Sequence, residues 1–355
     1  MLHEKLNPPE TKGHVSVARL TRYWYVACQS ADLAEKPLAR SVLGVPLVLF
    51  RDGAGRAAAL LDRCPHRNVP LSLGRVVQGG RLECAYHGWQ FEGSGRCVHV
   101  PGLLADATRD RRTPAAAVRE QDGLVWVYPE LDVPEPDVSP FRLQSPGAGY
   151  TRVVREVEAE ATLHATVENA LDVPHTAYLH RGLFRGGKQN EISATVRRSA
   201  DRVEVQYEGE PRPSGIAGRV LSPSGGVIQH WDRFILPSIA QVEYRMGDDV
   251  HFLVNSLCTP ESDFRTRMWA VVEFRTRFPS RAVARVLEPF ARRIFGQDAR
   301  MLRAQAENIR RFGGERYLST ELDFLGPHIW RLLKQAEAGD TSGDAVVERT
   351  VKFMA

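Results

Sequence analysis

The sequence predicts an α+β protein in two parts: a small all-β module, followed by a domain in which a large antiparallel sheet carries a few helices. Three observations lead to this prediction. Short strand-like runs broken by turns fill the first third of the chain, a proline-rich stretch follows, and strong helical periodicity occurs in only two later segments. The predicted order is an N-terminal arm (1–22), the β module (23–128), a proline-rich linker (129–148) and the second domain (149–355).

Two strand-like runs define the β module. One is Val42–Phe50, closed by a turn at Asp52-Gly53, and the other is Gly123–Tyr128, which follows the turn residue Asp122. Further turn signals, such as Gly79-Gly80, separate the short runs between them. Short strands with dense turns are typical of a small all-β domain.

Composition and charge exclude several classes of protein. The 355 residues are 43% hydrophobic and 25% charged, which is ordinary for a globular chain and excludes wholesale disorder. The chain has no run of about 18 apolar residues, and its start lacks the apolar core of a secretion signal, so we expect a cytoplasmic protein without a membrane span. The net charge of +4 rests on dispersed arginines, with six lysines among 47 basic residues, which argues against nucleic-acid binding.

Five cysteines in a chain without an export signal favour metal ligation over a disulfide framework. Four potential ligands form two mixed pairs, Cys64 with His66 and, after seventeen intervening residues, Cys84 with His87. Zinc would accept two cysteines and two histidines, but a common zinc finger takes both cysteines from one element and both histidines from the other. One thiolate and one imidazole in each loop better suit a two-iron cluster whose irons have different ligands.

This spacing resembles the motif of the Rieske family, in which two cysteines and two histidines hold a [2Fe–2S] cluster. The resemblance covers about residues 23–128. It implies that the cluster is bound by Cys64, His66, Cys84 and His87. The family also places an aromatic residue after the second histidine, so the resemblance implies that Trp89 packs against the cluster.

In the second domain, strand-like runs recur at Arg152–Glu158, at Arg202–Tyr207 and between Ile228 and Val254. Helical periodicity is strong around Glu168–His180 and from about Arg281 to Phe312. Strands that outnumber helices in this way predict an antiparallel sheet with helices packed against it.

A second group of potential metal ligands lies in the first helical segment. Asn169, Asp172 and His175 are three residues apart and share one side of a helix, whereas His180 lies about 140° further round. Both histidines can reach one ion only if the helix is interrupted, and Pro174 provides a reason for an interruption. The alternative is a distorted helix with two hydrogen-bonded core histidines.

Two histidines need a carboxylate to complete the facial triad that binds non-haem Fe(II). Asp298 falls on one helical face with Ile294, Met301 and Leu302, and a carboxylate on an apolar face is costly to bury without a cation. We therefore expect Asp298 to be the third ligand. The alternative is a salt bridge from Asp298 to an arginine such as Arg303.

Together, the two patterns resemble the oxygenase component of the Rieske non-haem iron oxygenases. The iron motif of that family, N/E-x2-D-x2-H-x4-H, is matched by Asn169, Asp172, His175 and His180, and the context of its third ligand is matched by Gln297, Asp298 and Gln305. The resemblance implies that the [2Fe–2S] domain is followed in the chain by a helix-grip (START-like) sheet domain with a mononuclear Fe(II) site. A single chain of this length, without a small β subunit, implies the homotrimeric class.

The resemblance also implies a route for electrons. Asp172 can accept a hydrogen bond from the free ring nitrogen of His175. In the family the matching aspartate also meets the cluster histidine of a neighbouring subunit, here His87. The sequence has no G-x-G-x-x-G motif after a strand, so we expect a separate reductase or ferredoxin, fed by NAD(P)H, as a protein partner, and O2 as co-substrate.

Several oxidations share this metal apparatus. Single-chain relatives mostly act on bulky apolar molecules, so the resemblance implies hydroxylation or oxidative demethylation of a sterol, terpenoid or polyketide. The alternatives are an aromatic ring dihydroxylating dioxygenase and, outside catalysis, an electron carrier or a lipid-binding scaffold. Residues 181–187 are a candidate gate of the site, with a plain surface loop as the alternative.

Overall fold

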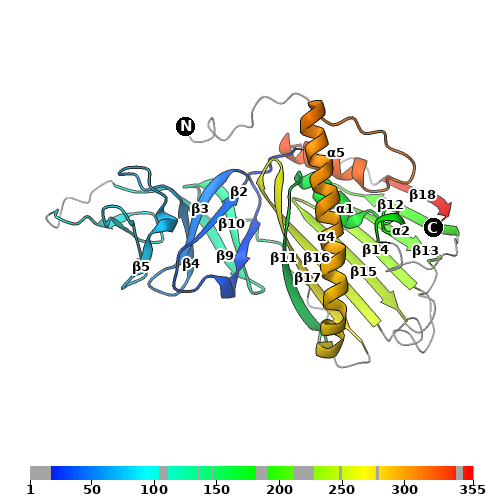
Figure 1. Cartoon of the computed structure of the whole chain (residues 1–355), viewed down its shortest axis with the longest axis horizontal. Helices are drawn as coiled ribbons and strands as arrows, with labels where there is room; N and C mark the ends of the chain where they lie inside the picture. The colour runs from blue at the N-terminus through cyan, green and yellow to red at the C-terminus, as the bar shows by residue number, and fades with distance from the viewer. Residues whose placement is uncertain are drawn as a thin grey trace. The chain divides into compact units, whose positions relative to one another are not determined.

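The structure is a computed structural model, and it describes residues 17–103, 111–134, 136–144, 147–180, 191–210, 228–247, 250–276, 280–340 and 347–354 (Figure 1). These residues form two compact units, of which the first comprises Thr21–Leu143 and Thr259–Ser262. The boundary at Leu143 falls inside the predicted linker, and residues 17–20 of the predicted N-terminal arm belong to the second unit. No helix in the described ranges is long and apolar enough to cross a membrane. The candidate gate at 181–187 lies outside the described residues.

The first unit contains two antiparallel sheets, one with the strand order β1-β10-β9-β4-β3-β2 and a smaller one with the order β5-β6-β7-β8. The strands of the larger sheet are β1 (Tyr25–Gln29), β2 (Leu38–Val42), β3 (Val45–Arg51), β4 (Ala57–Leu61), β9 (Ala115–Gln121) and β10 (Leu124–Leu131). Those of the smaller sheet are β5 (Arg75–Val77), β6 (Arg81–Glu83), β7 (Gln90–Phe91) and β8 (Cys97–His99). Two 3-10 turns, η2 (Ser30–Asp32) and η3 (Leu71–Leu73), complete the described elements. The predicted all-β module is confirmed.

Strand β3 is buried on both faces, which explains its unbroken apolar sequence. Leu47 and Leu49 point into one apolar cluster, and Val48 and Phe50 point into another, because successive side chains of a strand alternate between faces. The second cluster also contains two of the candidate ligands, Cys64 and Cys84. Their loops are therefore anchored in the core of the unit.

The prediction of one strand over Val42–Phe50 is wrong. The run is divided between β2 and β3 by a tight turn in which Leu43 and Gly44 have φ values of 52° and 80°. Two consecutive residues with positive φ are typical of the two-residue turns that join antiparallel strands. The apolar side chain of Leu43 conceals this turn in the sequence, because a non-glycine residue seldom adopts positive φ.

The second unit is built on an eight-stranded antiparallel sheet with the order β11-β17-β16-β15-β14-β13-β12-β18. The predicted runs correspond to β11 (Thr151–Ala159), β13 (Arg202–Glu208), β14 (Ile228–Ile235), β15 (Ile239–Met246) and the start of β16 (Val250–Ser262). The remaining strands are β12 (Glu191–Arg198), β17 (Arg265–Arg275) and β18 (Val347–Met354). The predicted antiparallel sheet is confirmed.

The helices form a layer against this sheet (Figure 1). Helix α1 (Leu163–Leu171) packs on β14, β15 and β17, the long α4 (Ser280–Phe312) on β11, and α5 (Gly326–Glu337) on β13. The one-turn α2 (Thr176–Leu179) follows α1 after a break. Helix α5 was not among the predicted elements, although its Gly-Pro start and its buried Ile329, Leu332 and Leu333 carry the expected signals.

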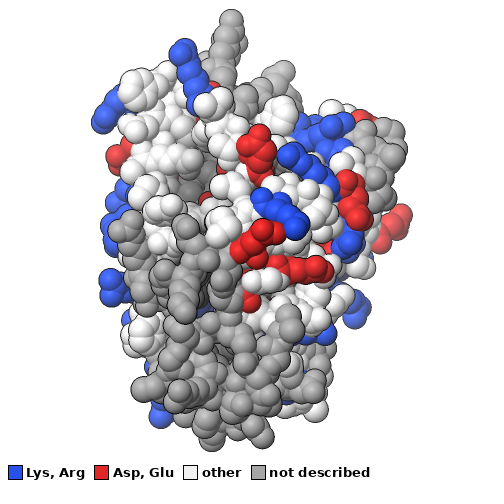
Figure 2. Space-filling model, turned by 90° about the vertical axis from the view of Figure 1, so that its right-hand side faces the viewer, with Lys and Arg blue, Asp and Glu red and all other residues white. Residues whose placement is uncertain are grey.

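Charged side chains of both signs are interspersed on the face that Figure 2 shows. In the second unit, charged side chains pair across neighbouring strands, as do Arg197 with Glu348 at 2.9 Å and Lys352 with Glu191 at 2.9 Å. Among the described residues on this face, no broad basic patch is seen, in agreement with the dispersed arginines of the sequence.

Two glycines of the first unit offer a matched test of its turn geometry. Gly80 has a φ of 65°, and a Cβ there would lie 2.1 Å from the carbonyl carbon of Asp52, whereas Gly55 has a φ of 75° with nothing within 4 Å. We predict that Gly55→Ala lowers the unfolding free energy of this unit by about 1 kcal/mol, from backbone strain alone. Gly80→Ala should cost more than about 3 kcal/mol, because the backbone must also move. Thermal unfolding followed by circular dichroism checks this, and equal losses in the two variants would contradict it.

Candidate metal centres

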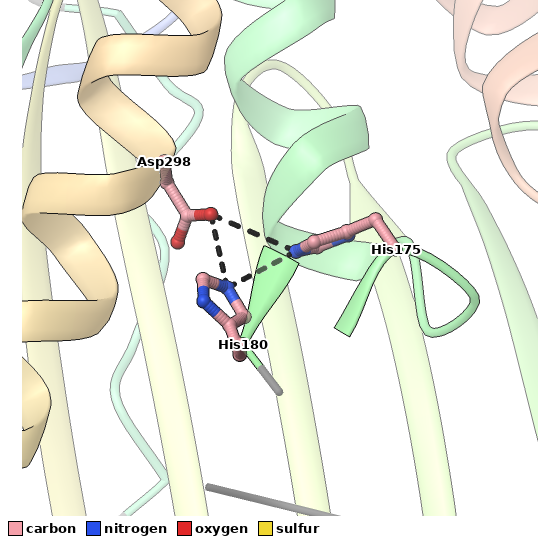
Figure 3. A group of neighbouring side chains, drawn as sticks. All are labelled: His175, His180 and Asp298. Atoms are coloured by element: carbon pink, nitrogen blue, oxygen red, sulfur yellow. Dashed lines mark hydrogen bonds and ion pairs between the residues drawn. The ribbon is translucent and has the colours of Figure 1, made fainter. Parts of the chain in front are cut away.

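Two histidines and an aspartate converge between α2 and α4 (Figure 3). Nε2 of His180 lies 3.1 Å from Oδ1 of Asp298, and Nε2 of His175 lies 3.6 Å from the same oxygen. The two Nε2 atoms are 3.3 Å apart. The structure therefore brings together the three residues that the sequence predicts as ligands of one ion.

The chain reaches this arrangement through a break in the helix. Helix α1 runs from Leu163 to Leu171 and is capped by Thr162, whose side chain accepts a hydrogen bond from the Ala165 amide. Asp172 is extended, with φ −84° and ψ 103°. Pro174 restricts the residue before it to extended backbone, so the helix cannot continue through this point. The new turn, α2, carries His180 back toward His175.

The three side chains are better suited to bind a metal ion than to form hydrogen bonds with one another. Oδ1 of Asp298 is buried and makes no hydrogen bond within the described residues. Burial raises the pKa of Asp298, against the opposing effect of the two histidines. A buried carboxylate oxygen that faces two imidazole nitrogens is costly without a cation. Two imidazoles and one carboxylate are the ligand set of a non-haem Fe(II) site with open positions.

A second set of residues surrounds the three candidate ligands. Oε1 of Gln297 lies 2.9 Å from Nδ1 of His180. Asn169 donates a side-chain hydrogen bond that lowers the pKa of Asp298. Oδ2 of Asp172 faces Nδ1 of His175 at 3.4 Å, at the edge of hydrogen-bond distance, and that nitrogen has no hydrogen-bond partner among the described residues. Burial opposes a proton on His175, but Asp172 and Asp298 outweigh it and raise the pKa of this histidine.

The predicted apolar face around Asp298 needs one correction. Leu302 is buried, but Met301 has 54% of its surface exposed. The alternative of a salt bridge between Asp298 and Arg303 finds no support, since the Arg303 guanidinium lies 2.6 Å from Oε1 of Glu160.

The second candidate centre lies in two loops of the first unit. The Cys64 amide donates to the Val69 carbonyl, and the Cys84 amide donates to the Trp89 carbonyl, which curls each loop around its cysteine. His66 and His87 meet with ring centroids 4.4 Å apart. His66 also stacks on Trp89, with 4.9 Å between centroids and 5° between planes.

These loops fit a cluster with mixed ligands. The two cysteines are buried, whereas His87 lies at the surface of the unit. Nδ1 of His66 is buried and has no hydrogen-bond partner within the described ranges. Buried imidazole nitrogens normally have a hydrogen-bond partner, and a nitrogen without one is free to bind a metal ion.

Comparison with known protein families gives two matches. The Rieske [2Fe-2S] domain matches residues 23–109, and the C-terminal domain of vanillate O-demethylase oxygenase matches residues 159–339. The second match alone spans half of the chain.

Individual relatives agree with these matches. The chain is 27% identical to the oxygenase component of chloroacetanilide N-alkylformylase from Rhizorhabdus wittichii, over 86% of this chain and 91% of that one. It is 26% identical to the vanillate O-demethylase oxygenase subunit of a Pseudomonas species, over 89% and 94%. The oxygenase component of dicamba O-demethylase from Stenotrophomonas maltophilia is 38% identical, but this match spans only 44% of the present chain and 47% of that relative.

Solved structures share the fold. A crystal structure of dicamba monooxygenase bound to 3,6-dichlorosalicylic acid superposes with a TM-score of 0.78 and 23% identity, over 92% of this chain and 100% of that one.

Replacing the three converging residues one at a time should distinguish the mononuclear iron from the cluster. His175→Ala, His180→Ala and Asp298→Ala should each lower the iron content from about three to about two ions per chain, because each removes one of three ligands of a mononuclear site. The rhombic signal of the reduced cluster should persist in all three, whereas Met301→Ala, on the exposed side of α4, should change neither. Iron analysis with electron paramagnetic resonance measures both. If Asp298→Ala keeps its mononuclear iron, the third ligand is elsewhere, with Glu307 and Glu321 as the next candidates.

Glu168 lies one turn before Asp172, and we expect it to make the folding stability of the protein depend on pH. Burial, then Asp172 and Asp323, raise the pKa of Glu168 to about 7 from its usual 4.5. As the pH rises from 4.5 to about 7, Glu168 loses its proton in the unfolded chain before it does so in the folded protein, so the free energy of unfolding falls. Glu168→Gln should therefore be more stable than the unaltered protein above about pH 7, by at most about 3 kcal/mol, and no different near pH 4. Urea unfolding at both pH values tests this, with Glu208→Gln, at an exposed position of the same unit, as control. A difference in stability that does not change with pH contradicts the prediction.

Proposed function

Because the chain belongs to the Rieske non-haem iron oxygenases, as an oxygenase (alpha) component of the vanillate demethylase type, we propose that it oxidises a small molecule with O2 and electrons from a separate reductase. Its cofactors are a Rieske [2Fe–2S] cluster and a mononuclear non-haem iron. The single observation that carries the proposal is the convergence of His175, His180 and Asp298 in the same chain as the cluster loops. An electron carrier or a lipid-binding scaffold would not need this triad.

We assign the ligands residue by residue. The cluster is held by Cys64, His66, Cys84 and His87, with Trp89 packed on His66. The mononuclear iron is held by His175, His180 and Asp298. When bound, an Fe(II) with this ligand set has free positions for O2, and the cluster supplies electrons one at a time.

The neighbouring residues act by positioning these ligands. Nδ1–H of His180 donates to Oε1 of Gln297, which leaves the lone pair of Nε2 directed at the iron position. Asn169 holds the Asp298 carboxylate by a hydrogen bond. Asp172 faces the remaining ring nitrogen of His175 and stabilises the orientation in which Nε2 points at the same place.

The comparisons support a monooxygenase, or an O- or N-demethylase, of small molecules. Relatives named vanillate O-demethylase and dicamba O-demethylase favour oxidative demethylation over aromatic ring dihydroxylation. We propose hydroxylation or oxidative demethylation of a bulky, largely apolar molecule such as a sterol, terpenoid or polyketide.

Incubation of the protein with a reductase, NADH, O2 and a panel of steroids and methoxyarenes tests this function. Turnover should release formaldehyde from a methoxyarene, or add one oxygen atom to a steroid, as read by mass spectrometry. The His175→Ala variant, which lacks an iron ligand in this scheme, should form no product. NADH consumption without an oxidised product from any member of the panel would contradict the proposed chemistry.

We also propose a homotrimer in which Asp172 of one subunit meets His87 of the next. A ring of three subunits closes such head-to-tail contacts. Asp172→Asn should then keep both metals and the trimer but lower turnover about 10- to 100-fold, the usual cost of losing a group that supports a metal ligand.

Mixed trimers decide whether electrons cross between subunits. A His66→Ala chain lacks a working cluster and a His175→Ala chain lacks the iron, so each alone should be inactive. Activity recovered in trimers that contain both chains supports transfer between subunits. Proven mixing without recovery contradicts it, and Asp172 would then orient His175 only within its own chain.

A further inference from the structure

A positive charge lies beside the cluster loops of the first unit. The segment that contains Arg111 pairs with the chain around β8, where the Cys97 amide donates to the Arg111 carbonyl at 2.9 Å. In the same segment, Arg112 forms an isolated bridge with Arg96. The guanidinium carbon of Arg111 lies over the Trp89 ring, 5.7 Å from its centroid. Backbone pairing therefore holds the start of this side chain, and its charged end contacts the indole ring.

Trp89 connects this charge to the candidate cluster ligands. Its ring stacks on His66, with 4.9 Å between centroids and 5° between planes, and its carbonyl accepts a hydrogen bond from the Cys84 amide. The two ring distances together keep the Arg111 charge within about 11 Å of the His66 ring, close to the Debye length of about 10 Å at 0.1 M salt. Arg111 and Trp89 are both half-buried, so salt screens this charge less than it screens a fully exposed arginine.

The charge of Arg111 also reaches the core beneath the loops. Cys97 belongs to the apolar cluster that contains Cys64 and Cys84. Burial raises the pKa of Cys97, against the opposing effects of the His99 backbone and of the Arg111 charge. In the part of the chain that the structure describes, no carboxylate forms an ion pair with Arg111. The cation therefore acts on the cysteine core without a matched anion among these residues.

A cation in this position favours the reduced state of the cluster. One-electron reduction adds a negative charge to the cluster, while a guanidinium keeps its positive charge. At an effective dielectric constant of about 20, two unit charges about 10 Å apart change an equilibrium by about 10-fold, and salt and water reduce this effect. Charge and solvent exposure are among the factors that set the potential of iron–sulfur clusters. The position of Arg111 is therefore suited to raise the potential of the cluster.

We propose that Arg111, held over Trp89, raises the reduction potential of the Rieske cluster and so sets how readily the cluster accepts an electron from the reductase. In this step one electron passes from the reductase to the cluster, and no covalent bond forms or breaks. Arg111 acts through its charge and is a positioning residue of the electron-transfer reaction. The inference rests on the proposed cluster ligands, and it depends neither on the substrate nor on the mononuclear iron.

A charge series at Arg111 in the intact holoenzyme tests the inference. Arg111→Lys keeps the positive charge, Arg111→Gln and Arg111→Met remove it, and Arg111→Glu reverses it. Titration with dithionite at one fixed pH, followed by the rhombic signal of the reduced cluster, gives the potential without turnover. Each lost charge should shift the one-electron equilibrium toward the oxidised cluster about 3- to 10-fold, or about 30 to 60 mV at 59 mV per tenfold. The potential of Arg111→Lys should stay near that of the unaltered protein, and that of Arg111→Glu should fall about twice as far as that of Arg111→Gln.

Arg112→Gln is the matched control, because Arg112 is the next residue, has a side chain that is 55% exposed and pairs with Asp132 at 2.6 Å. It should shift the equilibrium less than about 2-fold, since solvent screens its charge. Two neutral variants keep the test decisive if one of them fails to bind the cluster. Unchanged potentials in Arg111→Gln and Arg111→Met would overturn the proposal, as would an equal shift in Arg111→Lys or in Arg112→Gln. An unaltered protein without the rhombic signal would instead contradict the cluster assignment, and the inference with it.

Discussion

The candidate iron site depends on the interruption of one helix. In an unbroken helix, His175 and His180 would point about 140° apart and no ion could contact both. The break between α1 and α2 turns this spacing into a convergence, with the two Nε2 atoms 3.3 Å apart. Pro174 is the local cause, since it disfavours helical backbone in the residue before it. Asp298 approaches the same point from α4 (Figure 3).

Many of the buried charged side chains described in the second unit are paired. The outer face of the sheet holds matched partners such as Arg233 with Glu243. Facing the helices, two carboxylate oxygens lack a donor within the described ranges, Oδ1 of Asp298 and Oδ2 of Asp232. Because an unpaired buried carboxylate is costly, the Asp298 site is expected to receive a cation that the chain does not supply. We propose that this cation is the mononuclear iron, held with His175 and His180.

The two units hold their candidate metal ligands on different kinds of scaffold. In the first unit, short loops curl around buried cysteines and present the histidines, and the sheets beneath hold the loops through the core that contains Cys64 and Cys84. In the second unit, helices carry the ligands and a wide sheet supports them. Loops around a cluster need backbone hydrogen bonds to keep their shape, whereas helix-borne ligands need neighbours such as Gln297 to fix their ring orientation.

The sequence by itself determined the fold class, the predicted strands from Thr151 onward and the two groups of candidate ligands, because strand alternation, helical periodicity and ligand spacing are local properties of the chain. It misplaced the strand across Leu43, where an apolar residue takes a positive φ, and it passed over α5. Only the tertiary structure decided that Gln297 supports His180 and that Glu210, His230 and Asp232 form one buried group. The contacts of Gln297 with His180 and of Glu210 with His230 join separate parts of the fold, and distances between such parts are set by packing and sheet register, which no local pattern of residues encodes.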